Sequence, residues 1–455
     1  MSTLTTIGNA ARWSVRKVLR LYYPRIEVEG RERIPASGAV LFVANHPNSL
    51  MDPAVIGFAA QRPVHFFAKA PLFDVPVFGA LMKALGMVPA YRGQDDKASV
   101  RKNLETLDLG AKYLVQGGAV GVFPEGKTHD REGVEQVRTG AARIAASAAQ
   151  GGAQFVVVPL GLNYERKERF RSSIWVRVGK PIDAGKLFRE HGGEERKAMR
   201  LLTEEIDARL KRAVVHLNEE RWQPFLDELE VLLPPVGDAV ADPIAALRQR
   251  KVLADAINYF FRTDLARAEA VGAALEQHRK VVTTAGLTVA SPVLRLGVGR
   301  LTGRLLLDSL RLLLGLGPAL AGTLHHLAPF AITRGIVQRI KHPGRPTIAQ
   351  NRLMIGLPIY AIWYAAVWLL IATHHAVWLA WLWTALMPLA GVAALHFAWR
   401  VRVAGRAWWQ ELQMVFRPAR LRRLRHSHLN VRRQLEQLRK EYLQVPVGTR
   451  SQSAA

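Results

Sequence analysis

Residues 40–52, VLFVANHPNSLMD, join a short apolar run to a polar loop. The apolar part has the length and the β-branched and aromatic content of a buried strand. Similar runs recur along the chain, at residues 64–67, 119–123 and 155–158, with helical patterns between them, at residues 98–116 and 139–150. Strands that alternate with helices predict an α/β domain with a largely parallel sheet. In such a sheet the functional side chains usually lie at the strand ends. The main polar motifs of this chain follow directly after these runs.

The polar loop after the first run carries a candidate acid–base pair. Histidine has an ordinary pKa of about 6.5, so it can take a proton from a hydroxyl near neutral pH. A carboxylate that accepts from the other ring nitrogen fixes the tautomer and stabilises the imidazolium. His46 and Asp52 supply these groups if the residues between them form a tight turn. The alternative is that each side chain only hydrogen-bonds its own backbone.

A second polar motif, residues 121–128 (GVFPEGKT), also follows a strand-like run. Its glycines, lysine and threonine have the spacing of the nucleotide-binding phosphate loop. That loop binds phosphate with consecutive backbone N–H groups, but Pro124 has none and the carboxylate of Glu125 repels an anion. The apolar run also continues through Val122 and Phe123, where the loop should already have begun. We therefore interpret this motif differently.

The composition restricts the class of partner. The chain has 63 Lys and Arg residues against 37 Asp and Glu residues, which gives a formal net charge of +26. Such an excess calls for a polyanion, either nucleic acid or an anionic membrane face. No motif that reads nucleic acid is recognisable, and long apolar segments favour the membrane. Because the chain has no cysteine, disulfides, zinc–thiolate sites and cysteine nucleophiles are excluded.

Two apolar runs, residues 355–373 and 376–399, contain no Lys, Arg, Asp or Glu. Each is about 20 residues long, enough to cross the roughly 30 Å hydrocarbon core of a membrane. His374 and His375 form a polar turn between the runs, and arginines flank both outer ends. The positive-inside rule therefore predicts a transmembrane hairpin with both ends in the cytoplasm. The alternative is a buried hairpin in a soluble protein.

Four other segments bear on the membrane. Residues 12–23 have a basic amphipathic pattern, which suits either a helix on a membrane surface or a helix docked on the domain. Residues 301–332 are Leu-rich but begin with charged positions, so we interpret them as a buried or interfacial helical hairpin. The basic tail after residue 400 would attract anionic lipid head groups. Residues 1–21 lack the apolar core of a secretory signal, so we expect the catalytic groups in the cytoplasm.

Four blocks of motif residues occur in a fixed order, at residues 46–52, 71–92, 123–126 and 158–161. Together they resemble the glycerolipid acyltransferase superfamily, which includes glycerol-3-phosphate and lysophosphatidate acyltransferases. The superfamily usually has four residues between its His and its Asp, whereas five separate His46 from Asp52. This spacing is similar to a subgroup that includes fungal-type glycerol-3-phosphate and dihydroxyacetone-phosphate acyltransferases, and it favours glycerol 3-phosphate as the acceptor.

The resemblance implies a role for each motif residue. His46 is then the general base, and Asp52 is the carboxylate that orients it. Arg92 would bind the acceptor phosphate, because a guanidinium fork matches phosphate geometry. Glu125 and Gly126 would shape the acceptor site.

Further polar residues near these motifs have open roles. Lys69 and Lys127 are additional candidates for phosphate binding, with a solvated surface lysine as the alternative. His129 and Asp130 are either a second acid–base pair or, as we favour, a structural turn. No metal-ligand spacing is present in the sequence, so no metal site is predicted.

The implied reaction is transfer of a fatty acyl group to a hydroxyl of glycerol 3-phosphate or its monoacyl form, in phosphatidate and phospholipid synthesis. The sequence has no cysteine and no Gly-x-Ser-x-Gly elbow, so an acyl-enzyme is not indicated. The hydroxyl would attack the thioester of acyl-CoA or acyl-carrier protein directly, with no cofactor. The alternatives are a remodelling lysophospholipid acyltransferase and a non-catalytic membrane scaffold. Anionic membrane lipids are expected partners, and nucleic acid is not.

The predicted fold is an α/β acyltransferase domain followed by a helical region and a transmembrane helical hairpin. Its segments are an amphipathic basic helix (1–25), the acyltransferase domain (26–215), a helical region (216–352), the transmembrane hairpin (353–400) and a basic cytoplasmic tail (401–455). We expect the protein in the cell (inner) membrane, with its catalytic domain on the cytoplasmic side.

Overall fold

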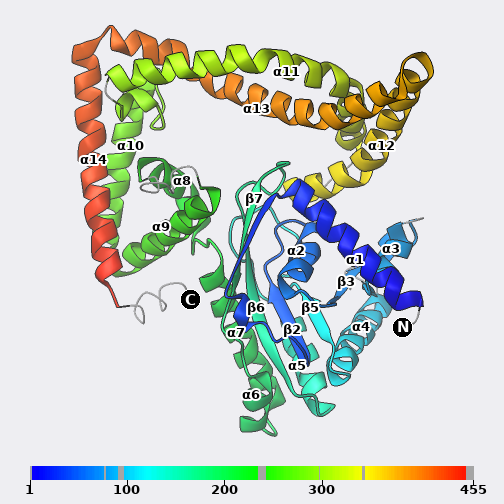
Figure 1. The fold of residues 1–455 in the computed structure, drawn as a ribbon. Helices are drawn as coiled ribbons and strands as arrows, with labels where there is room; N and C mark the ends of the chain where they lie inside the picture. Colours follow the sequence, from blue (N-terminus) through cyan, green and yellow to red (C-terminus); the bar gives the residue numbers. More distant parts are fainter. Residues whose placement is uncertain are drawn as a thin grey trace.

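A computed structural model describes residues 3–75, 78–90, 97–233, 242–296, 298–340 and 344–446. These residues form an α/β body, a helical module beside it, and three long helices that extend over both (Figure 1). The predicted fold class, an α/β domain followed by helices, is confirmed.

One seven-stranded sheet forms the centre of the α/β body, with the strand order β1-β7-β6-β2-β5-β3-β4. The strands are β1 (Arg25–Glu29), β2 (Ala39–Ala44), β3 (His65–Lys69), β4 (Val88–Ala90), β5 (Ala119–Val122), β6 (Phe155–Tyr164) and β7 (Ser173–Val178). Neighbouring strands are parallel except for β6 and β7, which pair antiparallel. The four apolar runs found in the sequence correspond to β2, β3, β5 and β6, and the sheet is largely parallel as predicted.

Two layers of helices cover the sheet. One layer contains α1 (Thr3–Tyr22) and α2 (Met51–Ala60), with α3 (Phe78–Ala84) beside α1. The other contains α4 (Lys97–Val115), α5 (Gly140–Gln150), α6 (Ala184–Glu190) and α7 (Glu195–Ala213). In β2, Val40 and Phe42 pack in the first layer and Leu41 and Val43 in the second, as the alternation of a strand requires. Because both faces are buried, β2 is apolar throughout and its first polar residues lie beyond its carboxyl end.

Helix α1 has a docked end and an exposed end. Leu19 and Tyr22 are buried in the first core layer, whereas Trp13 is 62% exposed. The docking alternative thus describes the last turns of α1. The earlier turns leave an aromatic ring and several cations on the surface.

The helical module contains α8 (Gln223–Leu232), α9 (Pro243–Thr263), α10 (Leu265–Thr284) and α14 (Pro418–Gln444). Helix α14 belongs to the predicted basic tail, and it runs alongside α10 (Figure 1). Val431 and Leu435 of α14 are buried with Leu253 and Leu275 of the module. An apolar stripe therefore docks α14 and leaves arginines such as Arg422 exposed.

The three long helices are α11 (Val298–Arg339), α12 (Ile348–His374) and α13 (Val377–Val415). In the described part of the chain, three segments are long and apolar enough to cross a membrane: Thr302–Arg339, Arg345–His374 and Val377–Arg402. The turn between α12 and α13 lies at His374 and His375, as predicted. Exposed leucines, such as Leu314 at 73%, show that much of this apolar surface is not covered by protein.

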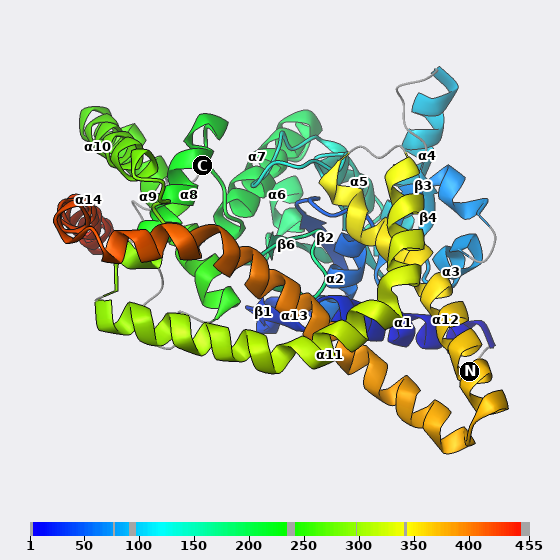
Figure 2. The same ribbon diagram turned by 90° about the horizontal axis from the view of Figure 1, so that it is seen from above.

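The interpretation of residues 301–332 as a helical hairpin is wrong, because α11 is one uninterrupted helix that includes Pro318 and Pro329. Its high leucine content favours helix, and residues 312–333 contain no charged side chain that would form a polar turn. Helices α11 and α13 lie alongside each other (Figure 1, Figure 2). A Cβ on Gly322 would lie 2.1 Å from the carbonyl oxygen of Ala390, so glycine allows this close approach.

His216 joins the α/β body to the helical module. Its Nδ1 accepts a hydrogen bond from the backbone N–H of Val134, and its carbonyl oxygen accepts one from the side chain of Asn258. Burial, reinforced by the positive charges of Lys211 and Lys251, lowers the pKa of His216 to about 3. The folded protein therefore holds this ring neutral, whereas the unfolded chain protonates it below pH of about 6.5.

Between pH 6.5 and about 3 the unfolded chain binds a proton here that the folded chain does not bind, so stability falls as the pH falls. A single group of this kind contributes a slope of about 1.4 kcal/mol per pH unit. Thermal unfolding midpoints at pH 7, 6 and 5 should fall less steeply for His216→Asn than for the wild type. The exposed His426→Asn is the matched control and should behave as the wild type. Equal pH slopes for the wild type and His216→Asn would contradict the assignment.

Candidate active site

The two polar motifs meet at one edge of the sheet. His46 follows β2 and Glu125 follows β5, and these strands are parallel neighbours. Asn45 fixes the position of the first loop, because its side chain accepts from the N–H of Leu162 and donates to the carbonyl of the same residue. The loop therefore starts from a defined point next to β6.

His46 and Asp52 form the predicted contact. The Nδ1 atom of His46 lies 2.9 Å from Oδ2 of Asp52, which lies in the first turn of α2. The backbone between His46 and Asp52 turns at Ser49, which has a left-handed φ of 46°. The backbone N–H of Asp52 donates to the Ser49 carbonyl at 3.2 Å and closes the turn. The five intervening residues therefore form the tight turn that the pair requires.

The carboxylate of Asp52 is fully buried and has three partners. Besides His46, the backbone N–H of Asn48 donates to Oδ2 at 2.7 Å, and the hydroxyl of Tyr164 donates to Oδ1 at 2.6 Å. Burial and the adjacent carboxylate raise the pKa of Tyr164 above its usual range, so this hydroxyl remains a donor. Tyr164 was not predicted from the sequence. It ends β6, outside the motifs that resemble the superfamily.

The ring of His46 is held on its face as well as at its edge. It stacks on Phe123 with ring centroids 3.9 Å apart and an interplanar angle of 10°. Its side chain is 17% exposed, and no hydrogen bond joins Nε2 to any residue that the structure describes. The contact with Asp52 therefore fixes Nδ1 and leaves Nε2 to exchange a proton with a bound molecule.

Glu125 forms a second buried pair beside the first. Its Oε2 lies 2.6 Å from Nε2 of His129 and accepts from the backbone N–H of His46 at 3.3 Å. Its Oε1 is buried and has no hydrogen-bond partner among the described residues, and the same holds for Nδ1 of His129. His129 therefore pairs with Glu125 and not with Asp130, whose carboxylate binds Lys167 at 2.9 Å. A buried carboxylate oxygen without a donor suits a hydroxyl of a bound molecule.

Two glycines of the second motif are needed at their positions for different structural reasons. Gly126 has a φ of 73°, a left-handed conformation that closes the turn after Pro124 and Glu125. Gly121 lies inside β5, where a Cβ would come within 2.1 Å of the Phe66 ring. The backbone up to residue 122 is therefore strand, which excludes the phosphate-loop interpretation of residues 121–128.

The three predicted phosphate ligands differ in their surroundings. Arg92 lies outside the described residues. Lys69 ends β3 with an exposed side chain. Lys127 follows the glycine turn, and its ammonium pairs with Glu135 at 2.9 Å.

The start of α12 lies against this edge of the sheet. Arg345 binds both carboxylate oxygens of Asp130 at 3.0 and 3.1 Å, and the Ser49 hydroxyl donates to the side-chain carbonyl of Gln350 at 2.9 Å. Arg352 donates to the carbonyl of Glu168 at 2.8 Å. Sequence analysis missed these contacts because the partners are far apart in the chain and belong to no common motif. They attach a candidate membrane helix directly to the loops of the site.

Comparison with known proteins agrees with the motif analysis. Residues 25–163 match the model of the family described as Acyltransferase. Glycerol-3-phosphate O-acyltransferase 2 of Saccharomyces cerevisiae is 39% identical over 82 residues, which are 18% of this chain and 11% of that protein. The 1-acyl-sn-glycerol-3-phosphate acyltransferase LPAT1, chloroplastic, of Arabidopsis thaliana is 28% identical over 155 residues, which are 34% of this chain and 39% of that protein.

A solved structure of the 1-acyl-sn-glycerophosphate (LPA) acyltransferase of Thermotoga maritima is 21% identical in sequence to this chain. The matched region covers 45% of this chain and 76% of the Thermotoga chain, with a TM-score of 0.31. The chain spans about a tenth and about two fifths of the lengths of the two curated relatives. The region shared with the family model begins at β1, ends in β6 and contains His46, Asp52 and Glu125. Residues 25–163 of this chain therefore match the acyltransferase family model, and the two curated relatives to which the chain is similar are glycerolipid acyltransferases.

Proposed function

We propose that the protein transfers a fatty acyl group from an acyl thioester to a hydroxyl of glycerol 3-phosphate or its monoacyl form, in phospholipid synthesis. The observation that supports this most directly is the His46–Asp52 contact at 2.9 Å, which leaves Nε2 of His46 without a hydrogen-bond partner among the described residues. The buried carboxylate of Glu125 accepts from the backbone N–H of the same histidine. This arrangement combines a base for a hydroxyl proton with an acceptor for a second hydroxyl.

The mechanism is a direct transfer. Nε2 of His46 takes the proton of the acceptor hydroxyl, and the oxygen attacks the thioester carbonyl carbon. A C–O bond forms and the C–S bond breaks, and the departing thiolate takes the proton back from the imidazolium. Asp52 stabilises the imidazolium, because its charge lies on the opposite edge of the ring. Acyl-CoA or acyl-carrier protein serves as co-substrate, and the reaction as proposed uses no metal or cofactor.

The acceptor would bind at the second motif. We assign Oε1 of Glu125 to a glycerol hydroxyl, since His129 already holds Oε2. Arg92 would bind the phosphate, with Lys69 and Lys127 as further candidates. Gly126 would shape the turn that joins Glu125 to Lys127. The five-residue spacing of the His–Asp motif supports glycerol 3-phosphate as the acceptor, and so does the similarity to a yeast protein named as a glycerol-3-phosphate acyltransferase. A remodelling lysophospholipid acyltransferase is the alternative, because it would share these motifs.

The site would work at a membrane surface. We propose that the apolar helices insert in the cell (inner) membrane, with the α/β body on its cytoplasmic face next to anionic lipids. The net charge of +26 and the direct contacts of Arg345 and Gln350 with the catalytic loops support this placement. An acylated product could then pass from the site into the adjacent lipid.

The first test is acyl transfer by the purified protein in detergent. Palmitoyl-CoA and palmitoyl-acyl-carrier protein would be offered as donors, and glycerol 3-phosphate, lysophosphatidate and lysophosphatidylcholine as separate acceptors. We expect turnover with glycerol 3-phosphate or lysophosphatidate, and a loss of about 10²- to 10⁴-fold in His46→Ala, the usual contribution of a general base. Turnover that survives in His46→Ala would refute the assignment of the base. Turnover with lysophosphatidylcholine alone would favour the remodelling enzyme, and an intact protein inactive with every pair would favour a scaffold.

Tyr164 is a positioning residue in this mechanism. Tyr164→Phe removes the hydrogen bond to Oδ1 of Asp52 and should lower kcat by about 10- to 100-fold, because a hydrogen bond to a charged group contributes about 1.5–3 kcal/mol. The acceptor KM should stay unchanged, since Tyr164 acts through Asp52 and His46. Tyr259→Phe in the helical module is the matched control. A change in KM with constant kcat would show that Tyr164 binds substrate instead.

The acceptor site can be tested through KM. Glu125→Gln and Arg92→Ala should each raise the acceptor KM by about 10-fold or more, because each removes a charge-assisted contact. The donor KM should not change. Glu190→Gln and Arg200→Ala, at exposed positions on α6 and α7, are the matched controls. Unchanged acceptor kinetics in either variant would remove that residue from the proposed site.

A further inference from the structure

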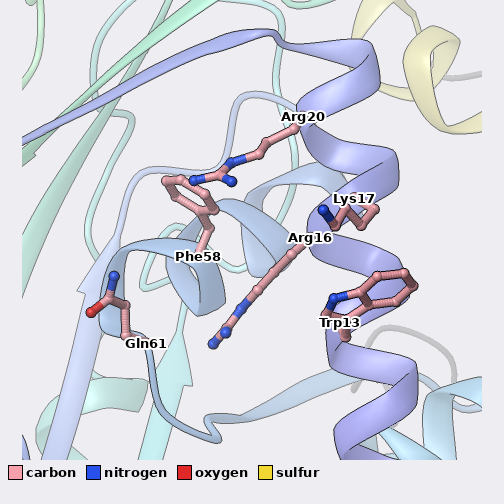
Figure 3. Close-up of a pocket in the computed structure, with 6 residues that line it drawn as sticks. All are labelled: Trp13, Arg16, Lys17, Arg20, Phe58 and Gln61. Atoms are coloured by element: carbon pink, nitrogen blue, oxygen red, sulfur yellow. The ribbon is translucent and has the colours of Figure 1, made fainter.

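A cationic pocket lies between α1 and the carboxyl-terminal end of α2 (Figure 3). Its cavity volume is about 250 Å³, and its lining residues are Trp13, Arg16, Lys17, Arg20, Phe58 and Gln61. Phe58 is six residues beyond Asp52 in α2, which places it roughly 9 Å further along the helix. The pocket therefore belongs to the opposite end of α2 from the proposed chemistry.

The charges around this pocket are not balanced by the protein. Arg12, Arg16 and Arg20 recur every four residues along α1, a spacing at which like charges repel. Burial and then the charges of Arg16 and Arg20 lower the pKa of Arg31, which lies just after β1. No carboxylate in the described part of the chain pairs with Arg16, Lys17, Arg20 or Arg31. An anion is the ligand that such a group of cations would bind.

The geometry shows a built site and not only a charged surface. The guanidinium groups of Arg20 and Arg31 lie 5.2 and 5.7 Å from the centroid of the Phe58 ring, so one aromatic ring positions both cations. Nη1 of Arg31 is buried and has no hydrogen-bond partner among the described residues. A buried N–H without an acceptor favours a ligand that brings several oxygens, as a phosphate does.

The surroundings of the pocket favour a lipid over a free anion. Trp13 lines the pocket and lies under the ammonium of Lys17 at 5.3 Å, and Leu21, about two turns further along α1, is 54% exposed. Exposed aromatic and aliphatic side chains next to cations are typical of a helix at a membrane interface.

The end of α1 is also attached to the start of α12. The hydroxyl of Tyr22 and the guanidinium of Arg352 both donate to the carbonyl of Glu168, at 3.0 and 2.8 Å. α1 therefore has a fixed position next to a helix that is long and apolar enough to cross a membrane.

We propose that this pocket binds the phosphate of an anionic membrane phospholipid, separately from the acyl acceptor, and so holds the α/β body against the bilayer. The inference rests on the proposed membrane association and is independent of acyl transfer. Trp13 and Leu21 contact the lipid interior, and Arg16, Lys17 and Arg20, which line the pocket, surround the head group. Arg31 adds its charge from the Phe58 ring that it shares with Arg20.

The test measures lipid binding to the full-length protein in detergent by calorimetric titration. The three titrants are dioctanoyl phosphatidylglycerol, dioctanoyl phosphatidylcholine and inorganic phosphate. We expect phosphatidylglycerol to bind most tightly, and its affinity to fall at least 10-fold in the triple variant Arg16→Gln, Lys17→Gln, Arg20→Gln. The matched control removes the same charge from the exposed face of α7, as Arg196→Gln, Lys197→Gln, Arg200→Gln, and should bind as the wild type.

Three results would overturn the proposal: unchanged affinity in the pocket variant, equal loss in the α7 variant, or inorganic phosphate binding as tightly as phosphatidylglycerol. The last would identify a site for free phosphate. If the triple variant does not fold, as judged by its thermal midpoint, the exposed Arg20→Gln and Trp13→Ala replace it, and each should weaken phosphatidylglycerol binding. Acyl transfer is assayed on the same wild-type sample, so a failure of the proposed activity is recorded separately from this result.

Discussion

The buried carboxylate of Asp52 is the constraint on which the site depends. It has no exposed surface, and a buried charge is stable only when its oxygens are hydrogen-bonded. Its partners come from three places: the His46 ring after β2, the Asn48 N–H in the turn, and the Tyr164 hydroxyl at the end of β6. Removing one partner of a buried charge typically costs about 3–5 kcal/mol, so the loop, helix α2 and strand β6 hold one another in place.

The loop between β6 and β7 connects this arrangement to the candidate membrane helix α12. Lys167 binds Asp130, which also binds Arg345, and the carbonyl of Glu168 accepts from both Tyr22 and Arg352. The loops that follow β2 and β5 therefore contact the same short segment as α1 and α12. In the described part of the chain, direct contacts therefore join the proposed site to a candidate membrane helix.

Much of the site could be predicted because its residues follow the strands directly. The apolar runs gave the strands, the parallel sheet brought the ends of β2 and β5 together, and His46 and Glu125 follow those ends. The prediction failed for residues 301–332, where charged positions suggested a hairpin and α11 is one helix. The leucine-rich stretch without a charged turn residue favours one helix, and what the sequence does not show is the partner of that helix, since Gly322 packs against Ala390 of α13.

The sequence by itself determined the α/β class, the His46–Asp52 pair and the apolar helices, because these depend on local periodicity and on groups a few residues apart. Only the tertiary structure showed that Tyr164 binds Asp52 across 112 positions and that Arg345 binds Asp130 across 215. It also showed that the carboxylate of Glu125 binds His129 and leaves one oxygen without a partner in the described chain. Such contacts arise when distant segments pack together, and neither residue type nor spacing specifies them in advance.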